Sequence, residues 1–210
     1  MDFQGSGILP TVILIIIILV SLSVHEFAHA AVANIFGDPT ARLEGRLTLN
    51  PIAHWDPIGT TLLVGLLLAS GLGANIPLIF GWGKPVPVNE SNFENPRFHG
   101  FQTAMAGPMS NFLLALVIAL VMKFTQLPDM VNGALTLAIF INLFLMFFNL
   151  LPVPPLDGSR ILRLFISDRA YYALASNPLF LIALLLLLFS FLGQYLIRAT
   201  ALLSQLLLSL

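Results

Sequence analysis

Residues 8–36 read ILPTVILIIIILVSLSVHEFAHAAVANIF, an apolar run whose only ionisable side chains are His25, Glu26 and His29. A run of this length suits a transmembrane helix. Ionisable residues at membrane depth are costly and are by default functional. Two histidines four residues apart share one helix face and can bind one zinc ion, and the glutamate beside them can take a proton from zinc-activated water. This stretch therefore predicts zinc-dependent hydrolysis within a bilayer.

The composition of the whole chain also indicates a membrane environment. Of 210 residues, 58% are hydrophobic and 9% charged, and the mean hydropathy is +0.93. These values are typical of a multi-span membrane protein embedded in the lipid bilayer. The net charge of -1 and the lack of a basic cluster argue against a nucleic-acid partner. Cysteine is absent, so a metal must be held by histidine and carboxylate. The oligomeric state stays open.

Apolar runs predict core spans near residues 10–35, 98–124 and 133–151, and further apolar helix over residues 179–210. That tail reads as a helical hairpin, or as one span plus an interfacial helix. We expect residues 1–210 to form a single membrane-embedded domain. Its fold class is all-α and polytopic, a bundle of about five to six transmembrane or re-entrant helices.

Two polar segments predict a small β element. In residues 41–49, Arg42, Glu44 and Arg46 alternate with apolar or small residues, which is the period of a strand. Residues 81–89 read GWGKPVPVN, and their prolines allow at best an extended edge strand.

Residues 58–80 decide on which side of the membrane the later segments lie. His25 lies about 22 Å along the helix from Pro10, so the histidines are near the end of the first span. If residues 58–80 dip in and return, the fourth apolar run ends on the same face as the histidines. Seven basic residues then share that face: Arg42, Arg46, Lys84, Arg97, Arg160, Arg163 and Arg169. Because basic residues favour the cytoplasmic side, we predict a re-entrant segment and a site that opens to the cytoplasm.

A catalytic zinc needs a third protein ligand. The candidates are the two other histidines and four acidic residues at the right face: His54, His99, Asp56, Glu90, Glu94 and Asp157. Asp157 is favoured by its setting in NLLPVPPLDG, residues 149–158, where prolines end the fourth apolar run and can project a carboxylate inward. Asp157-Gly158 is also an ordinary turn or helix-cap sequence, so its spacing alone leaves both readings open.

The order of these motifs resembles the site-2 protease family of intramembrane zinc metalloproteases. That family pairs HExxH in one span with NxxPxPxxDG in a later span, here residues 25–29 and 149–158. Residues 81–88 are similar to the compact bacterial and archaeal members, and AGPMSN, residues 106–111, is similar to the family's middle core span. No insertion resembling a PDZ or nucleotide-sensing domain is recognised.

The resemblance implies that Asp157 is the third zinc ligand and that the substrate is a transmembrane segment of another protein. It also favours Asn149 as a contact for the substrate backbone or oxyanion, although Asn149 can equally cap the broken helix. His54 can fold back towards the site or stay solvated, and Asn111 can support the site or only pack between helices.

The predicted function is therefore an intramembrane endopeptidase with one zinc ion, water as nucleophile and Glu26 as general base. The alternative is a metal-ion or solute transporter that uses the same His/Asp cluster. A transporter needs a polar path between faces, and residues 13–20, beyond His25, are all apolar.

Overall fold

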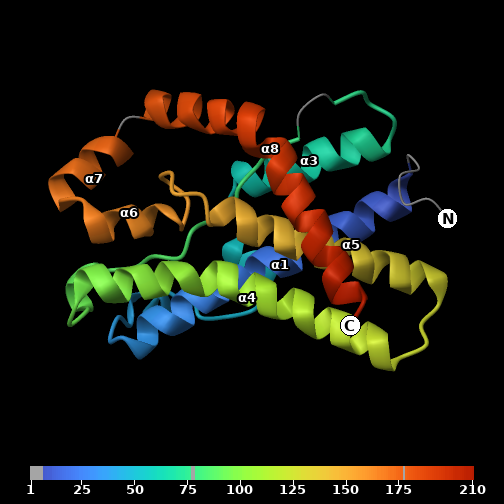
Figure 1. The fold of residues 1–210 in the computed structure, drawn as a ribbon, viewed down its shortest axis with the longest axis horizontal. Helices are drawn as coiled ribbons and strands as arrows, with labels where there is room; N and C mark the ends of the chain where they lie inside the picture. Colours follow the sequence, from blue (N-terminus) through green and yellow to red (C-terminus); the bar gives the residue numbers. More distant parts are fainter. Residues whose placement is uncertain (1–6, 77–78, 177) are drawn as a thin grey trace.

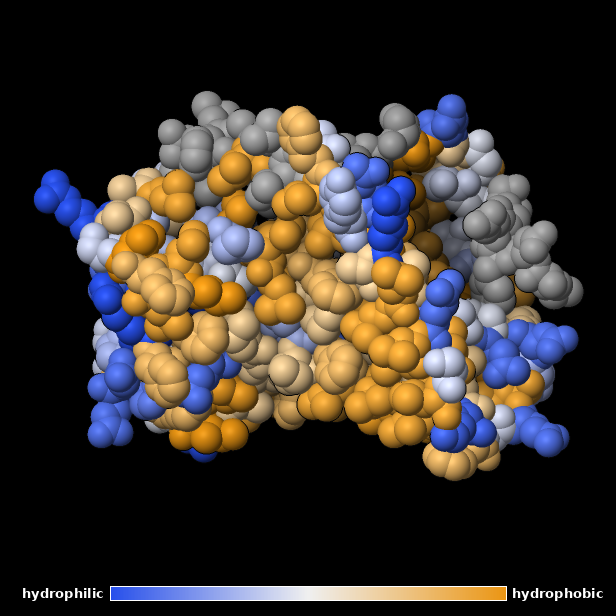
Figure 2. All heavy atoms as spheres, viewed as in Figure 1, coloured by the Kyte–Doolittle hydropathy of each residue, from blue (hydrophilic) through white to orange (hydrophobic). Residues whose placement is uncertain are grey.

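Four helices in the computed structural model are long and apolar enough to cross a membrane, by length and composition. They are α1 (Ile8–Ile35), α4 (Pro96–Phe124), α5 (Asp129–Asn149) and the Ser190–Leu208 part of α8 (Pro178–Leu208) (Figure 1). The structure describes residues 7–76, 79–176 and 178–210. Hydrophilic side chains gather towards both ends of the molecule, and the surface between them is mostly apolar (Figure 2). This is the surface of a multi-pass membrane protein.

Helices α4, α5 and α8 share an apolar core. Ala115 and Ala119 of α4 are buried against Ile139 and Leu143 of α5, and Leu207 of α8 joins the same cluster. Small residues let helix backbones approach closely, which matters in lipid because van der Waals packing drives helix association there.

Helix α1 lies on α4 and α5 through polar contacts at its second half. His29 Nδ1 lies 2.7 Å from Thr103 O, near the start of α4. Two turns earlier on α1, Ser21 O accepts from Asn111 Nδ2 at 3.3 Å, two turns further along α4. The two helices are thus antiparallel, and the end of α1 meets the start of α4 at one end of the bundle.

The apolar segment after α1 forms only a short helix. Helix α3 (Gly59–Gly71) has 13 residues, about 20 Å at 1.5 Å per residue, against the roughly 30 Å of a hydrocarbon core. The chain then returns to the beginning of α3, where Thr60 Oγ1 donates to Trp82 O at 3.0 Å. The start of α3 and Trp82 therefore lie side by side.

The predicted β element is wrong, because the described residues contain no strand. Residues 40–43 form a short helix, α2 (Thr40–Leu43). After it, Arg46 turns its side chain inward and donates to Lys84 O at 2.6 Å. The charge alternation that suggested a strand therefore belongs to a helical turn and a loop with one buried arginine.

Residues 81–89 are extended but pair with no strand. We call residues 79–89 the strap. Its backbone donors bond outside any ladder: Lys84 N to His54 O at 2.9 Å, Val86 N to a side chain of α1, and Asn89 N to Asp38 Oδ2 at 2.7 Å. Pro85 and Pro87 have no N–H to donate. The strap is thus held by individual contacts with the end of α1 and the loop after it.

Short helices complete the end of the bundle where α1 finishes. They are η1 (Pro51–His54), η2 (Glu90–Asn92), α6 (Ser159–Phe165) and α7 (Asp168–Ala175). Glu90 accepts from Arg160 of α6 at 2.5 Å and from Arg163, so the strap's end is tied to α6. The tail is one helix, α8, which changes direction along its length (Figure 1).

Candidate metal centre

His25 and His29 lie one turn apart on α1 and are almost fully buried, with 5% and 8% of their surface exposed. Each ring is held through its Nδ1. His29 Nδ1 bonds Thr103 O at 2.7 Å, and His25 Nδ1 bonds Asn111 Oδ1 at 2.7 Å. A carbonyl oxygen only accepts, so both Nδ1 atoms carry hydrogen and both Nε2 atoms of the neutral rings present a lone pair.

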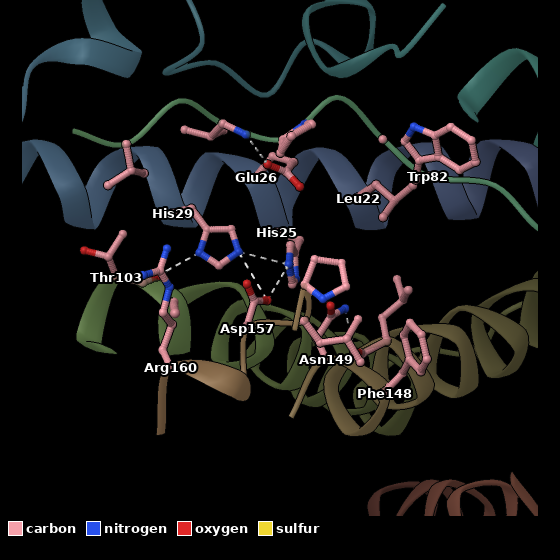
Figure 3. A pocket seen from close by; sticks show the side chains of 18 of the residues that line it. Leu22, His25, Glu26, His29, Trp82, Thr103, Phe148, Asn149, Asp157 and Arg160 are labelled. Atoms are coloured by element: carbon pink, nitrogen blue, oxygen red, sulfur yellow. Dashed lines mark hydrogen bonds and ion pairs between the residues drawn. The ribbon is translucent and has the colours of Figure 1, made fainter. Parts of the chain in front are cut away.

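The two lone pairs meet a carboxylate. The Nε2 atoms lie 3.0 Å apart, and Asp157 Oδ2 lies 3.1 Å from the first and 3.4 Å from the second (Figure 3). Asp157 Oδ2 is buried and has no hydrogen-bond donor. These three acceptor atoms converge with no hydrogen-bond donor between them, so a bound cation would stabilise the arrangement.

Asp157 reaches the histidines because the chain folds back after α5. Gly158 N donates to Asn149 O, the last residue of α5, at 2.6 Å. A Cβ on Gly158 would lie 2.2 Å from Leu150 O, so a residue without a side chain is needed for this close approach. The tight return sets the carboxylate beside α1.

Glu26 lies beside the cluster and under the strap. Its Oε2 accepts from Val86 N at 2.8 Å, and Oε1 has no partner among the described residues. Glu26, both histidines and Asp157 line one cavity of about 570 Å³, which the strap, α4, α5 and α6 complete (Figure 3). A carboxylate with one free oxygen thus shares a cavity with the candidate metal ligands.

Comparison with known proteins places this site in a family. Residues 127–190 match the description of peptidase family M50. A protein of Bacillus subtilis (strain 168), named "Putative zinc metalloprotease YwhC", is 44% identical over 159 residues, which are 71% of this chain and 67% of the relative. The chain belongs to peptidase family M50. The predicted membership of the site-2 protease family is confirmed.

Two further relatives are more distant. "Putative zinc metalloprotease Rip2" of Mycobacterium tuberculosis (strain ATCC 25618 / H37Rv) is 32% identical over 81% of this chain and 64% of its own length. "Zinc metalloprotease MJ0392" of Methanocaldococcus jannaschii is 28% identical over 88% of this chain and 44% of its own length. This chain therefore spans about two thirds of the length of the first relatives and less of the third. No solved structure matches it. The family match and the names of these relatives place the chain among the zinc metalloendopeptidases.

The residues present fit zinc. Catalytic zinc sites have three protein ligands from His and carboxylate, with a fourth position left open. Here two imidazole nitrogens and one carboxylate oxygen converge, each ring is fixed through its other nitrogen, and the oxygen lacks a donor. Among the described residues, no other group of three His, Cys, Asp or Glu side chains could hold a metal ion.

Gly107 of α4 faces the two histidines. A Cβ there would lie 2.4 Å from His29 Nε2 and 2.6 Å from His25 Nε2. We expect Gly107→Ala to weaken zinc binding at least about 10-fold, since the methyl group displaces either the rings or the ion. Metal analysis of the purified protein measures this. Gly100→Ala on the same helix is the matched control, because its Cβ would meet nothing closer than Glu90 Oε1 at 3.3 Å. Equal zinc content in all three proteins would contradict the expectation.

The other predicted site residues differ in where they lie. Asn111 contacts His25, as described. Asn149 lines the cavity, and its Nδ2 donates to Leu145 O at 3.0 Å. His54 is buried away from the cluster, where its Nε2 donates to Thr48 O at 2.8 Å. His54 therefore supports the loop and the strap. Among the earlier third-ligand candidates, the structure brings only Asp157 to the histidines.

Two buried polar residues near the site were missed from the sequence. Asn142 of α5 and Ser21 of α1 both belong to the network behind His25. A signal was present, because an asparagine in the middle of an apolar span is costly unless it is bonded. Ser21 also lies four residues before His25, on the same helix face.

Proposed function

We propose that this chain is an intramembrane zinc endopeptidase that cleaves transmembrane segments of other proteins. The convergence of His25 Nε2, His29 Nε2 and Asp157 Oδ2 in the cavity that also holds Glu26 supports this most directly. One zinc ion suffices for such a ligand set, because three donors leave one open position. The membrane-spanning length of α1, which carries three of these four residues, supports cleavage within the bilayer.

Each residue has a defined task in this proposal. The chemistry that a bound zinc ion supplies is Lewis acidity, which polarises the scissile carbonyl and acidifies water. Glu26 Oε1 takes the proton of the attacking water and returns it to the nitrogen of the leaving amine. Val86 N–H fixes Oε2 and so sets the plane of the carboxylate. Asn149 keeps a second N–H that can hold a substrate carbonyl in the cavity.

The substrate must be unwound before it is cut. A transmembrane helix hides its carbonyls in its own hydrogen bonds, and no water replaces those bonds in lipid. The cavity of about 570 Å³ is of the size of small-ligand sites, so it admits a short extended stretch and excludes an intact helix, which is about 10 Å wide.

We propose that the site opens to the cytoplasm. Seven of the nine Lys and Arg residues lie in the segment between α1 and α4, in the first turn of α4, or shortly after α5, so they belong to the end of the bundle that holds the site. Of the other two, Lys123 lies at the other end, close to the loop between α4 and α5, and Arg198 lies within α8. The cytoplasmic side carries the excess of basic residues.

Mapping of cleaved bonds tests this function. Wild-type protein and Glu26→Gln are produced in matched membranes, and new peptide termini are identified by mass spectrometry. The proposal predicts termini inside transmembrane segments in the wild-type sample alone. Termini confined to water-exposed domains, or the same termini in both samples, would refute it.

A further inference from the structure

Two buried asparagines behind His25 extend from it in one chain of hydrogen bonds. Asn142 Oδ1 accepts from Asn111 Nδ2 at 2.8 Å, and Asn111 Oδ1 accepts from His25 Nδ1 at 2.7 Å. Asn111 and Asn142 have 0% and 1% of their surface exposed. The chain joins α5, α4 and α1 at a depth that water does not reach.

The direction of every bond follows from one backbone carbonyl. Asn142 Nδ2 donates to Ala138 O at 2.9 Å and to Ser21 Oγ at 2.9 Å. Because Ala138 O can only accept, the amide of Asn142 must place its nitrogen there and its Oδ1 on the opposite side. That Oδ1 requires a donor, which fixes Asn111 Nδ2 towards it. Asn111 Oδ1 is then left to accept from His25.

The orientation of Asn111 decides which nitrogen of His25 is free. With Oδ1 facing the ring, the imidazole hydrogen sits on Nδ1 and the Nε2 lone pair faces Asp157 and His29. A flipped amide would turn Nδ2 towards His25 and move the hydrogen to Nε2, where it blocks metal binding. The flip would also set Asn111 Oδ1 against Asn142 Oδ1, two acceptors about 3 Å apart, which a buried site does not tolerate.

We propose that Asn142 is a positioning residue that fixes the amide of Asn111 and, through it, the nitrogen with which His25 binds zinc. The inference rests on the zinc site of the proposed function. Asn142 touches neither metal nor substrate; it acts from α5 across α4. Ser21 O also accepts from Asn111 Nδ2, but at 3.3 Å, so the 2.8 Å bond from Asn111 Nδ2 to Asn142 Oδ1 is the stronger constraint.

Zinc affinity tests the role directly. Full-length protein is purified, stripped of metal and titrated with zinc against a chromophoric chelator. Asn142→Leu keeps the volume and removes the acceptor, and we expect the affinity to fall about 10- to 100-fold, as when outer partners of a metal-bound histidine are lost. Asn142→Asp in its protonated form can donate its hydroxyl to Ala138 O and keep its carbonyl oxygen as the acceptor for Asn111 Nδ2. It is expected to bind zinc within a few-fold of wild type, which also covers the case that Asn142→Leu does not fold. Loss of affinity in Asn142→Asp equal to that in Asn142→Leu would overturn the proposal.

A second comparison separates positioning from packing. Ser21→Ala removes a bond of the same network without touching Asn111, and it is expected to keep the zinc affinity. In an Asn111→Ala background, Asn142→Leu is expected to have no further effect on affinity, because its route to His25 is gone. Additive losses would overturn the proposal. If the wild type itself binds no zinc, the proposed function fails; if the wild type binds zinc and Asn142→Leu binds it equally, this inference alone fails.

Discussion

Glu26→Gln is expected to bind zinc like the wild type and to lose about 10²- to 10⁴-fold in the rate of peptide-bond hydrolysis. Glutamine keeps the shape of the side chain and an oxygen that can accept from Val86 N–H. It cannot take up the proton of the attacking water, so the nucleophile is not formed. The rate is measured in proteoliposomes on a membrane segment found by the cleavage mapping, and the zinc content of the same preparation is measured by metal analysis.

Glu44→Gln is the matched control for this variant. It makes the same change of charge on an exposed side chain in the loop after α2, and it is expected to retain the wild-type rate. A Glu26→Gln protein that hydrolyses the segment at the wild-type rate would exclude Glu26 as general base. A variant that loses zinc would show that Glu26 supports the metal site.

Asp157→Ala is expected to lose the zinc ion, with content falling from about one per chain in the wild type to near zero after a chelator wash. The reason is that two histidine nitrogens remain where a catalytic site uses three ligands. His25→Ala removes a different ligand and is expected to give the same result. Both losses should exceed the roughly 10- to 100-fold effect of removing an outer partner.

Asp129→Ala serves as the control for the loss of an acidic residue, because Asp129 is exposed at the start of α5, the end of that helix away from the metal cluster. It is expected to keep about one zinc per chain. Retention of tightly bound zinc by Asp157→Ala would remove Asp157 from the ligand set. The acidic Glu90 in the same cavity would then be the next residue to replace.

The part of the candidate metal cluster that the sequence could predict is local. His25 and His29 share a helix face by the geometry of one turn, and the prolines before Asp157 mark where a helix must end. The pairing of these two distant motifs depended on the family resemblance, since spacing alone left Asp157 open. The contacts of Gly107 and Asn142 could not be predicted, because they depend on how α4 and α5 are rotated against α1, and packing sets that rotation.

The strand prediction failed for a physical reason that the alternation of charges does not reveal. A period of two indicates a strand only if the backbone finds a ladder partner. Here Thr40–Leu43 bonds within its own helical turn, Arg46 is buried on the strap, and the strap's donors are taken by Glu26, Asp38 and His54. Only the extended course of residues 81–89 agrees with the expectation.

The two histidines are held by different kinds of atom. The site therefore tolerates substitution of the residue that holds His29 better than substitution of the residue that holds His25. His29 is held by Thr103 O, a main-chain atom that any amino acid at position 103 supplies. His25 is held by the side chain of Asn111, which in turn donates a hydrogen bond to Asn142. A backbone atom therefore fixes His29, whatever residue occupies position 103. His25 instead depends on two side-chain amides, Asn111 and Asn142, and both must be retained. A member of the family that keeps HExxH but has lost either amide would carry an intact signature over an impaired metal site.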